Sequence, residues 1–245
     1  MRNLDGQRVV VTRAVHQAEE LAGPLRERGA EVVLLPVIAI APPADLYPLE
    51  LAAAQADRFD WIVFTSANAI NAFAAALGRE PDTVEARIAT VGAATQAAAQ
   101  RAGFNVSLTP DKYLAEALIE SFEAEKLNER RILIPSAAVT RDVVAPALRA
   151  RGATVEIVEA YRNVIPETAA ARAWEVFREP FPDWVTFAST SAVENLVRLA
   201  GAHKLARVKI ASIGPVTSSA VSAHGLEVAA EAAPHTVPGL VASIR

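Results

Sequence analysis

The chain has 245 residues, with 24 Lys and Arg against 28 Asp and Glu, which gives a formal net charge of −4. Hydrophobic residues make up 52% of the sequence, so global disorder is excluded. The mildly acidic balance, without a Lys/Arg cluster, argues against nucleic acid as the main partner. Because the chain contains no cysteine, disulfides, thiolate metal sites and cysteine nucleophiles are also excluded.

The sequence predicts a cytoplasmic protein with no membrane partner. Its first residues lack the apolar core of a signal peptide. The uncharged stretch at 32–44 contains Pro36, Pro42 and Pro43, and it is too short and too broken by proline to cross a bilayer. A monomer is the default expectation. The length fits two domains of roughly 120 residues or one large α/β domain.

The sequence contains an internal repeat. DWIVFTSANAINAFAAALG at 60–78 aligns with DWVTFASTSAVENLVRLAG at 183–201, a shift of 123 residues, and residues 8–34 match 131–157 at the same shift. The spacing Gly-x-x-Thr-x-x-Ala that begins at Gly92 recurs at Gly214. We therefore predict that one ancestral unit is present twice, and because the period is long, the copies are domains rather than solenoid turns.

Each copy alternates short β-branched runs with amphipathic segments. The expected strands are 8–12, 31–35, 60–65, 87–91, 104–108, 131–135, 154–158, 183–188, 208–213 and 226–230. These runs do not alternate strictly between apolar and polar residues, as is typical of strands covered on both faces. Helices lie between them; those at 16–28 and 139–151 each end at a glycine. The order predicts doubly wound parallel sheets of about five strands, two copies of them.

Two extended segments, 36–43 and 159–166, interrupt the alternation at the same phase of the repeat. They are compatible with two organisations that the pattern alone does not separate. Either the copies are tandem domains, or the chain crosses between two lobes here and the first two strands of each copy join the other copy's sheet. The exchanged organisation has one lobe at 1–36 plus 167–245, a second lobe at 44–158, and connectors at 37–43 and 159–166.

Small and hydroxylic residues follow most of the expected strands, where open parallel sheets bind their ligands. These turns are Thr12–Ala14, Thr65–Asn68, Gly92–Thr95, Thr109–Asp111, Ser136–Ala137, Ser189–Ser191 and Gly214–Thr217. Most of them open an expected helix, whose unpaired N–H groups and partial positive charge attract anions. Taken singly, such residues are ordinary helix caps. On two facing lobes together, they predict a cleft for a ligand with several carboxylates.

Several chemistries are missing from the sequence. It has neither the glycine-rich motifs that bind nucleotide phosphates nor H-E-x-x-H, and its four histidines are scattered singly. We therefore expect no cofactor and no metal. Asp60 and Asp183 precede apolar strands at equivalent positions. This placement predicts turn residues at the amino ends of the strands, away from the cleft.

Tyr161 is the candidate catalytic residue. It aligns with Ile38 in the other repeat, so the duplication does not account for it. A phenol that faces the cleft can donate a proton to a leaving group. The alternative is a linker tyrosine that packs on the hinge.

Six short segments carry a family resemblance. They are V-T-R-x-x-x-x-A-x-x-L at 11–21, G-A-E-V-x-x-x-P at 29–36, D-W-I-V-F-T-S-A-N-A-I at 60–70, E-A-Y-R-N at 159–163, F-x-S-x-S-A-V at 187–193 and I-G-P-x-T at 213–217. Each is a generic strand, turn or helix start, but their order and the chain length match. In this combination the sequence resembles the uroporphyrinogen-III synthase family.

The resemblance implies two α/β lobes with exchanged first strands, joined by two extended connectors. It also implies a lyase of porphyrin and haem biosynthesis that uses neither cofactor nor metal. Such an enzyme cyclises the linear tetrapyrrole hydroxymethylbilane to uroporphyrinogen III, with inversion of ring D and loss of water. The reactive pyrroles close unaided without inversion, so the enzyme mainly has to hold one folded geometry.

By resemblance, Tyr161 matches the tyrosine that helps the substrate hydroxyl to leave. The expected substrate-binding residues are Arg13, Ser66, Asn68, Thr95, Ser189, Ser191, Gly214 and Thr217. Arg13 follows the first strand and can meet a carboxylate, whereas at Asn68 some family members carry a different polar residue. The competing hypothesis is a non-catalytic two-lobed binder of a polycarboxylate small molecule. A periplasmic type of sugar or amino-acid binder is a third possibility, which the missing signal peptide disfavours.

Overall fold

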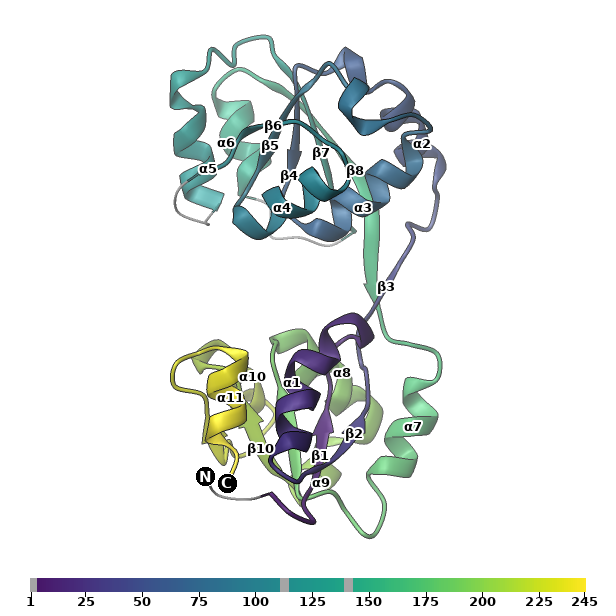
Figure 1. Cartoon of the computed structure of the whole chain (residues 1–245), viewed down its shortest axis with the longest axis vertical. Coiled ribbons are helices and arrows are strands. Elements are labelled where there is room, and N and C mark those ends of the chain that lie inside the picture. Colours follow the sequence, from purple (N-terminus) through teal and green to yellow (C-terminus); the bar gives the residue numbers. More distant parts are fainter. Residues whose placement is uncertain (1–3, 111–114, 139–142) are drawn as a thin grey trace. The chain divides into compact units, whose positions relative to one another are not determined.

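Two separate β-sheets organise the chain (Figure 1). The computed structural model describes residues 4–110, 115–138 and 143–245. It divides the chain into unit 1, which comprises Met1–Ala39 and Val164–Arg245, and unit 2, which comprises Ile40–Asn163. Asp111, in one of the predicted turns, and the first residues of the helix expected at 139–151 lie outside the described residues.

The sheet of unit 1 has the strand order β11-β10-β9-β1-β2. Its strands are β1 (Arg8–Val11), β2 (Glu31–Leu34), β9 (Trp184–Phe187), β10 (Lys209–Ser212) and β11 (Ala230–Glu231). Every neighbouring pair in this sheet is parallel. Strands from the beginning of the chain thus lie beside strands from its end, and the winding reverses between β1 and β9.

The sheet of unit 2 has the order β3-β8-β7-β4-β5-β6. Its strands are β3 (Ala39–Ala41), β4 (Trp61–Phe64), β5 (Arg87–Thr90), β6 (Val106–Leu108), β7 (Arg131–Ala137) and β8 (Thr154–Val164). The pairs β8–β7, β7–β4, β4–β5 and β5–β6 are parallel. Apart from the edge strand β3, the spatial order matches that of unit 1, with the reversal between β7 and β4.

The segment at 159–166, expected as a connector, is mostly strand. β8 continues to Val164 and pairs with β7 as far as Tyr161, while β3, from the other expected connector, lies at the edge of the sheet beside β8. Extended backbone leaves its N–H and C=O groups in need of partners, and a neighbouring extended segment supplies them. The largest differences from the expected strands are at β6, which starts only at Val106, and at β11, which overlaps the expected 226–230 at Ala230 alone.

Helices connect successive strands and cover both faces of each sheet (Figure 1). They are α1 (Val15–Glu27), α2 (Tyr47–Ala54), α3 (Ala67–Ala76), α4 (Ala93–Arg101), α5 (Ala115–Ser121), α6 (Val144–Ala150), α7 (Ala169–Val176), α8 (Thr190–Ala200), α9 (Ala202–Leu205), α10 (Pro215–Ala223) and α11 (Val237–Ser243). Among the described residues, no helix is long and apolar enough to cross a membrane.

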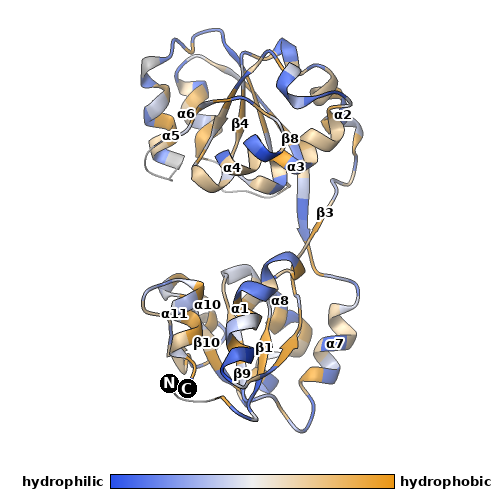
Figure 2. Cartoon of the chain, viewed as in Figure 1, coloured by the Kyte–Doolittle hydropathy of each residue, from blue (hydrophilic) through white to orange (hydrophobic). Residues whose placement is uncertain are grey.

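The central strands β1, β4 and β9 are apolar because both of their faces are buried. In β1, Val10 packs into one cluster with Phe177 and Val193, while Val9 and Val11 pack into the opposite one with Leu21 and Leu25. Unit 2 repeats this division on the two faces of β4. Figure 2 shows the hydrophobic residues concentrated on the strands inside each unit. This burial explains why the strand sequences do not alternate in polarity.

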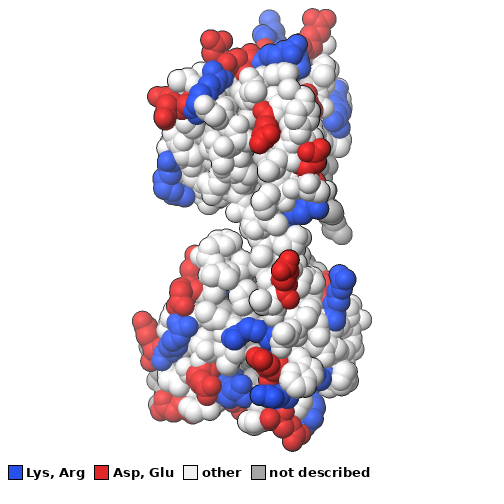
Figure 3. Space-filling model, turned by 90° about the vertical axis from the view of Figure 1, so that its right-hand side faces the viewer, with Lys and Arg blue, Asp and Glu red and all other residues white. Residues whose placement is uncertain are grey.

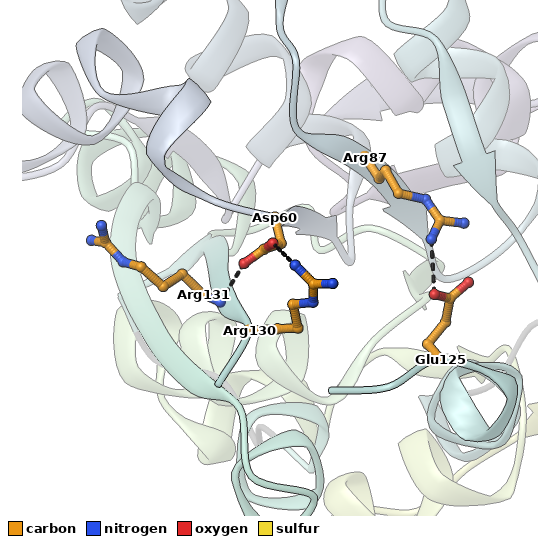
Figure 4. Close-up of polar contacts among 5 residues, drawn as sticks. All are labelled: Asp60, Arg87, Glu125, Arg130 and Arg131. Carbon is orange, nitrogen blue, oxygen red and sulfur yellow. Dashed lines mark hydrogen bonds and ion pairs between the residues drawn. The ribbon is translucent and has the colours of Figure 1, made fainter. Parts of the chain in front are cut away.

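Asp60 ties together the amino ends of two strands. Its carboxylate accepts a hydrogen bond from the backbone N–H of Arg131 at 2.8 Å and another from the Arg130 guanidinium at 2.6 Å (Figure 4). Asp183 makes the equivalent contact in unit 1, where it accepts the backbone N–H of Arg8 at 2.8 Å. Both aspartates lie at the edge where strands begin, which we call the amino edge, and their role is structural, as the sequence predicted.

Burial raises the pKa of the Asp60 carboxyl, but the Arg131 N–H and the Arg130 guanidinium outweigh it and hold that pKa below its ordinary value. A carboxyl pKa that is lowered on folding contributes stability that is present near neutral pH and lost as the pH falls through the folded-state pKa.

We expect Asp60→Asn to lower the free energy of unfolding at pH 7 by about 1 kcal/mol, because a partly exposed, charge-assisted hydrogen-bond pair is weakened. As the pH falls below about 4 the difference from the unsubstituted protein shrinks, because the unfolded carboxyl binds a proton first and the native carboxyl binds one at its lower pKa. Denaturant unfolding at several pH values measures both effects. Asp82→Asn, at an exposed residue with no described side-chain partner, is the control. A difference that does not change with pH would contradict the role of the charge.

Candidate active site

Helices begin at the edge of each sheet where the parallel strands end, which we call the carboxyl edge. In unit 2, α3 follows β4 and α4 follows β5, whereas in unit 1, α8 follows β9 and α10 follows β10. The N–H groups of the first turn of a helix have no partner within the helix, and they carry a partial positive charge. Each carboxyl edge therefore offers at least these two N-termini to an anionic group.

Ser66 and Ser189 are the N-caps of α3 and α8. Both are extended, and the Oγ of each accepts a hydrogen bond of 3.2 Å from the backbone N–H three residues later. Both serines therefore act as helix caps, as the sequence allowed. This capping leaves the N–H groups of the intervening residues free for an anion, among them those of Asn68 and Ser191.

Thr95 and Thr217 occupy the third position of α4 and α10. Their side chains are only 7% and 4% exposed, and none of the described hydrogen bonds uses either hydroxyl. The helices are preceded by Gly92 and Gly214, which supply no side-chain cap. Both helix starts therefore lack the self-capping seen at Ser66 and leave their first N–H groups open.

His235 packs against the start of α10, a contact that the sequence did not predict. A Cβ on Gly214 would lie 3.1–3.3 Å from the His235 ring and its Cβ. The His235 Nδ1 is 2.7 Å from the Ala232 carbonyl oxygen, which holds the ring in place. Nothing in the local sequence connects these two residues, because their contact depends on how the loop before α11 folds back.

Arg13 lies beyond the end of β1. Its side chain is 14% exposed, and its Nη1 is 3.0 Å from Glu20 Oε2, although the buried Nη1 makes no hydrogen bond of good geometry. Next to it, Thr12 donates to the Thr186 carbonyl at 2.7 Å and Thr186 donates to the Val10 carbonyl at 2.9 Å, which joins β1 to β9. Arg13 is thus already neutralised within unit 1, so a ligand carboxylate has to compete with Glu20.

Tyr161 lies in β8 next to a register shift. Ser136 pairs with Glu159 but Ala137 pairs with Tyr161, so β8 carries one extra residue at this point. Such a bulge redirects the side chain beside it. The half-buried Tyr161 ring packs against the core of unit 2, and its hydroxyl is 3.2 Å from Ser66 Oγ. The structure therefore brings the phenol to the N-terminus of α3, together with Ser66.

A cavity of about 550 Å³ lies beside Tyr161 within unit 2. Its walls are α2, α3, the segment 40–43 and residues Ala160 and Tyr161. The polar residues in the lining are Glu50, Asn68 and Asn71, and the lining contains no Lys or Arg. Because its one charged residue is acidic, this cavity suits an apolar group better than a carboxylate.

The surface shows no concentrated positive charge on the face drawn in Figure 3. On the face shown in Figure 3, Lys and Arg alternate with Asp and Glu, and neither sign forms a continuous patch. Over the described ranges, with their gaps at 111–114 and 139–142, no group of three or more His, Cys, Asp or Glu could hold a metal ion. On this face no cationic patch adds to the anion receptors that the helix N-termini supply.

These features define a mixed α/β protein with parallel sheets, whose carboxyl edges offer helix N-termini and one half-buried tyrosine. A family model described as uroporphyrinogen-III synthase HemD matches residues 19–242. The uroporphyrinogen-III synthase of Synechococcus elongatus is 31% identical, over 98% of this chain and 95% of its own length. That of Chlorobaculum parvum is 26% identical, over 90% of each chain. The chain belongs to the uroporphyrinogen-III synthase family, a family of lyases of porphyrin biosynthesis, and the predicted resemblance is confirmed.

Solved structures share the fold. A mutant uroporphyrinogen III synthase from Thermus thermophilus gives a TM-score of 0.63 at 20% identity, with 97% of this chain and 96% of the other covered. The enzyme from Helicobacter pylori gives a TM-score of 0.60 at 13% identity, with 96% and 97% covered. At these identities the likeness concerns the fold, and it confirms a mixed α/β architecture with parallel sheets.

We expect Gly214→Ala to displace the His235 ring with a small loss of stability, below about 1 kcal/mol. The backbone at Gly214 is extended, at φ 166°, so an alanine fits there and the strain is only the contact with the ring. NMR of the His235 ring and denaturant unfolding measure the two effects. In the His235→Ala background the substitution should cost nothing further, and equal losses in both backgrounds would contradict the contact.

Proposed function

We propose that this chain cyclises hydroxymethylbilane to uroporphyrinogen III, with inversion of ring D and loss of water, in porphyrin and haem biosynthesis. Family membership over residues 19–242 supports the reaction class. Within the structure, the observation that carries the proposal is the Tyr161 phenol at the N-terminus of α3, 3.2 Å from Ser66 Oγ. A non-catalytic binder of a polycarboxylate would have no use for a proton donor at that position.

The substrate carries acetate and propionate groups on every ring, and we assign these to the helix N-termini. Thr95, Gly214 and Thr217 are in the turns that open α4 and α10, where free N–H groups receive a carboxylate. Ser66, Asn68, Ser189 and Ser191 belong to the first turns of α3 and α8. Because the Ser66 hydroxyl donates to Tyr161, the backbone N–H groups are the expected donors at the start of α3. The Ser189 hydroxyl only accepts in its cap, so at the start of α8 it can donate to a carboxylate together with the backbone N–H groups. Arg13 contributes if the substrate displaces Glu20.

The chemical step begins at the terminal hydroxymethyl group. Tyr161 donates its phenolic proton to that hydroxyl as the C–O bond breaks, and water leaves. The resulting azafulvenium cation is attacked by the substituted carbon of ring D, which gives a spiro intermediate that rearranges and closes. The proton lost when the pyrrole recovers its aromaticity returns to the phenolate. The enzyme selects the type III product by holding the linear tetrapyrrole in one folded geometry, because unaided closure occurs without inversion.

We also infer that the fold is a duplication with exchanged first strands. Support comes from the matching sheet orders, from the equivalent Asp60 and Asp183 contacts, and from the equivalent Ser66 and Ser189 caps. The functional lobes in this proposal are 1–36 plus 167–245 and 44–158. A cytoplasmic monomer that works without a cofactor stays a prediction from the sequence.

Incubation with freshly prepared hydroxymethylbilane tests the proposed reaction. We expect an excess of the type III isomer over type I, at a rate above that of spontaneous closure. If only type I forms, at the spontaneous rate, the chain is a binder rather than a catalyst.

We expect Tyr161→Phe to reduce kcat by about 10²-fold, because a general acid is removed while the ring and its packing remain. Thermal unfolding should change little. Tyr47→Phe is the matched control, since Tyr47 is 65% exposed and its hydroxyl makes no described hydrogen bond. Unchanged turnover in Tyr161→Phe would remove this residue from the mechanism.

A further inference from the structure

We propose that Ser66 is a positioning residue, which fixes the Tyr161 phenol through a hydrogen bond and keeps the phenolic proton free for the substrate. The inference rests on the proposed role of Tyr161 as proton donor. It assigns to Ser66 a task beyond its helix cap and different from direct contact with a substrate carboxylate.

The direction of the two hydrogen bonds at Ser66 carries the argument. Its Oγ accepts the backbone N–H of Ala69 at 3.2 Å, and its hydroxyl donates to the Tyr161 oxygen at 3.2 Å. A hydroxyl has a single proton to donate. Because Ser66 donates that proton to the phenolic oxygen, Tyr161 is the acceptor in this contact. The O–H of Tyr161 therefore remains available as a donor.

The phenol is thereby held at two points. The Tyr161 ring packs against the core of unit 2, and the register shift in β8 sets the direction from which it leaves the strand. Ser66 holds the other end, and it is itself fixed, since it is extended at φ −155° and ψ 154° and bonded to the first turn of α3. A proton donor that is restrained in this way spends more of its time in reactive geometry.

The other half of the chain supplies an internal control. Ser189 has nearly the same backbone conformation, φ −162° and ψ 154°, and the same 3.2 Å cap to the Ala192 N–H. The residue that aligns there with Tyr161 is Ile38, which has no hydroxyl. None of the described hydrogen bonds joins the Ser189 hydroxyl to another side chain. Ser189→Ala therefore removes a cap without a tyrosine contact and is the control for thermal stability alone, whereas Ser66→Ala removes the cap and the phenol contact.

The first experiment compares the two serines. Ser66→Ala and Ser189→Ala should lower the thermal midpoint by similar amounts, because each loses one cap. Ser66→Ala should in addition lower kcat about 10-fold, with a KM change of less than about 3-fold, since the phenol loses its restraint. Ser66→Thr, which keeps both the cap and the O–H donor, should restore most of kcat. Ser66→Gly preserves the helix start almost as well as serine and should lose kcat as Ser66→Ala does.

The decisive measurement is the double variant Ser66→Ala/Tyr161→Phe. If Ser66 acts through the phenol, kcat of the double variant equals that of Tyr161→Phe within about 2-fold. If the two losses multiply, Ser66 acts on the substrate independently and the inference is overturned. Unchanged kcat in both Ser66→Ala and Ser66→Gly, alongside a slow Tyr161→Phe, overturns this inference alone. Unchanged kcat in Tyr161→Phe overturns the proposed proton donor, and with it the role of Ser66.

Discussion

Helix N-termini gather at one edge of each sheet because the strands are parallel, and the whole candidate site depends on this arrangement. Every parallel strand ends at the same edge, and the helix that follows it must begin there. Each helix start brings N–H groups without partners and a partial positive charge. The protein can in this way present several anion receptors although its net charge is −4. Arg13, the cation next to β1, is already matched by Glu20.

The two edges of each sheet have different tasks. At the amino edge, Asp60 and Asp183 hold neighbouring strands together through backbone N–H groups, so their charges stabilise the fold. At the carboxyl edge, the side chains that precede the helices are small, and Gly92 and Gly214 leave the N–H groups uncovered. A multiply charged, flexible substrate suits such an edge, since small residues let its carboxylates approach the backbone.

The halves of the chain are similar in structure but differ in chemistry. Ser66 and Ser189 cap α3 and α8, and among the described hydrogen bonds only Ser66 meets a tyrosine hydroxyl. Where unit 2 has Tyr161, the repeat has Ile38. Helix N-termini thus occur at the carboxyl edges of both units, whereas Tyr161, which we propose as the proton donor, lies in unit 2. This division fits an enzyme that binds a symmetric set of carboxylates but acts at one end of the substrate.

The sequence by itself determined most of the strands and the helix starts at two of the turns. Apolar runs located the strands, and the positions of Ser66 and Ser189 predicted helix starts, because such signals depend only on nearby residues. Family membership also followed from ordered local segments. Only the tertiary structure decided which strands pair, since tandem and exchanged sheets have the same local pattern. It also placed Tyr161 in β8 beside a register shift, paired Arg13 with Glu20 and set His235 against Gly214. These contacts form only when the folded backbone brings the residues together, so no local pattern in the sequence predicts them.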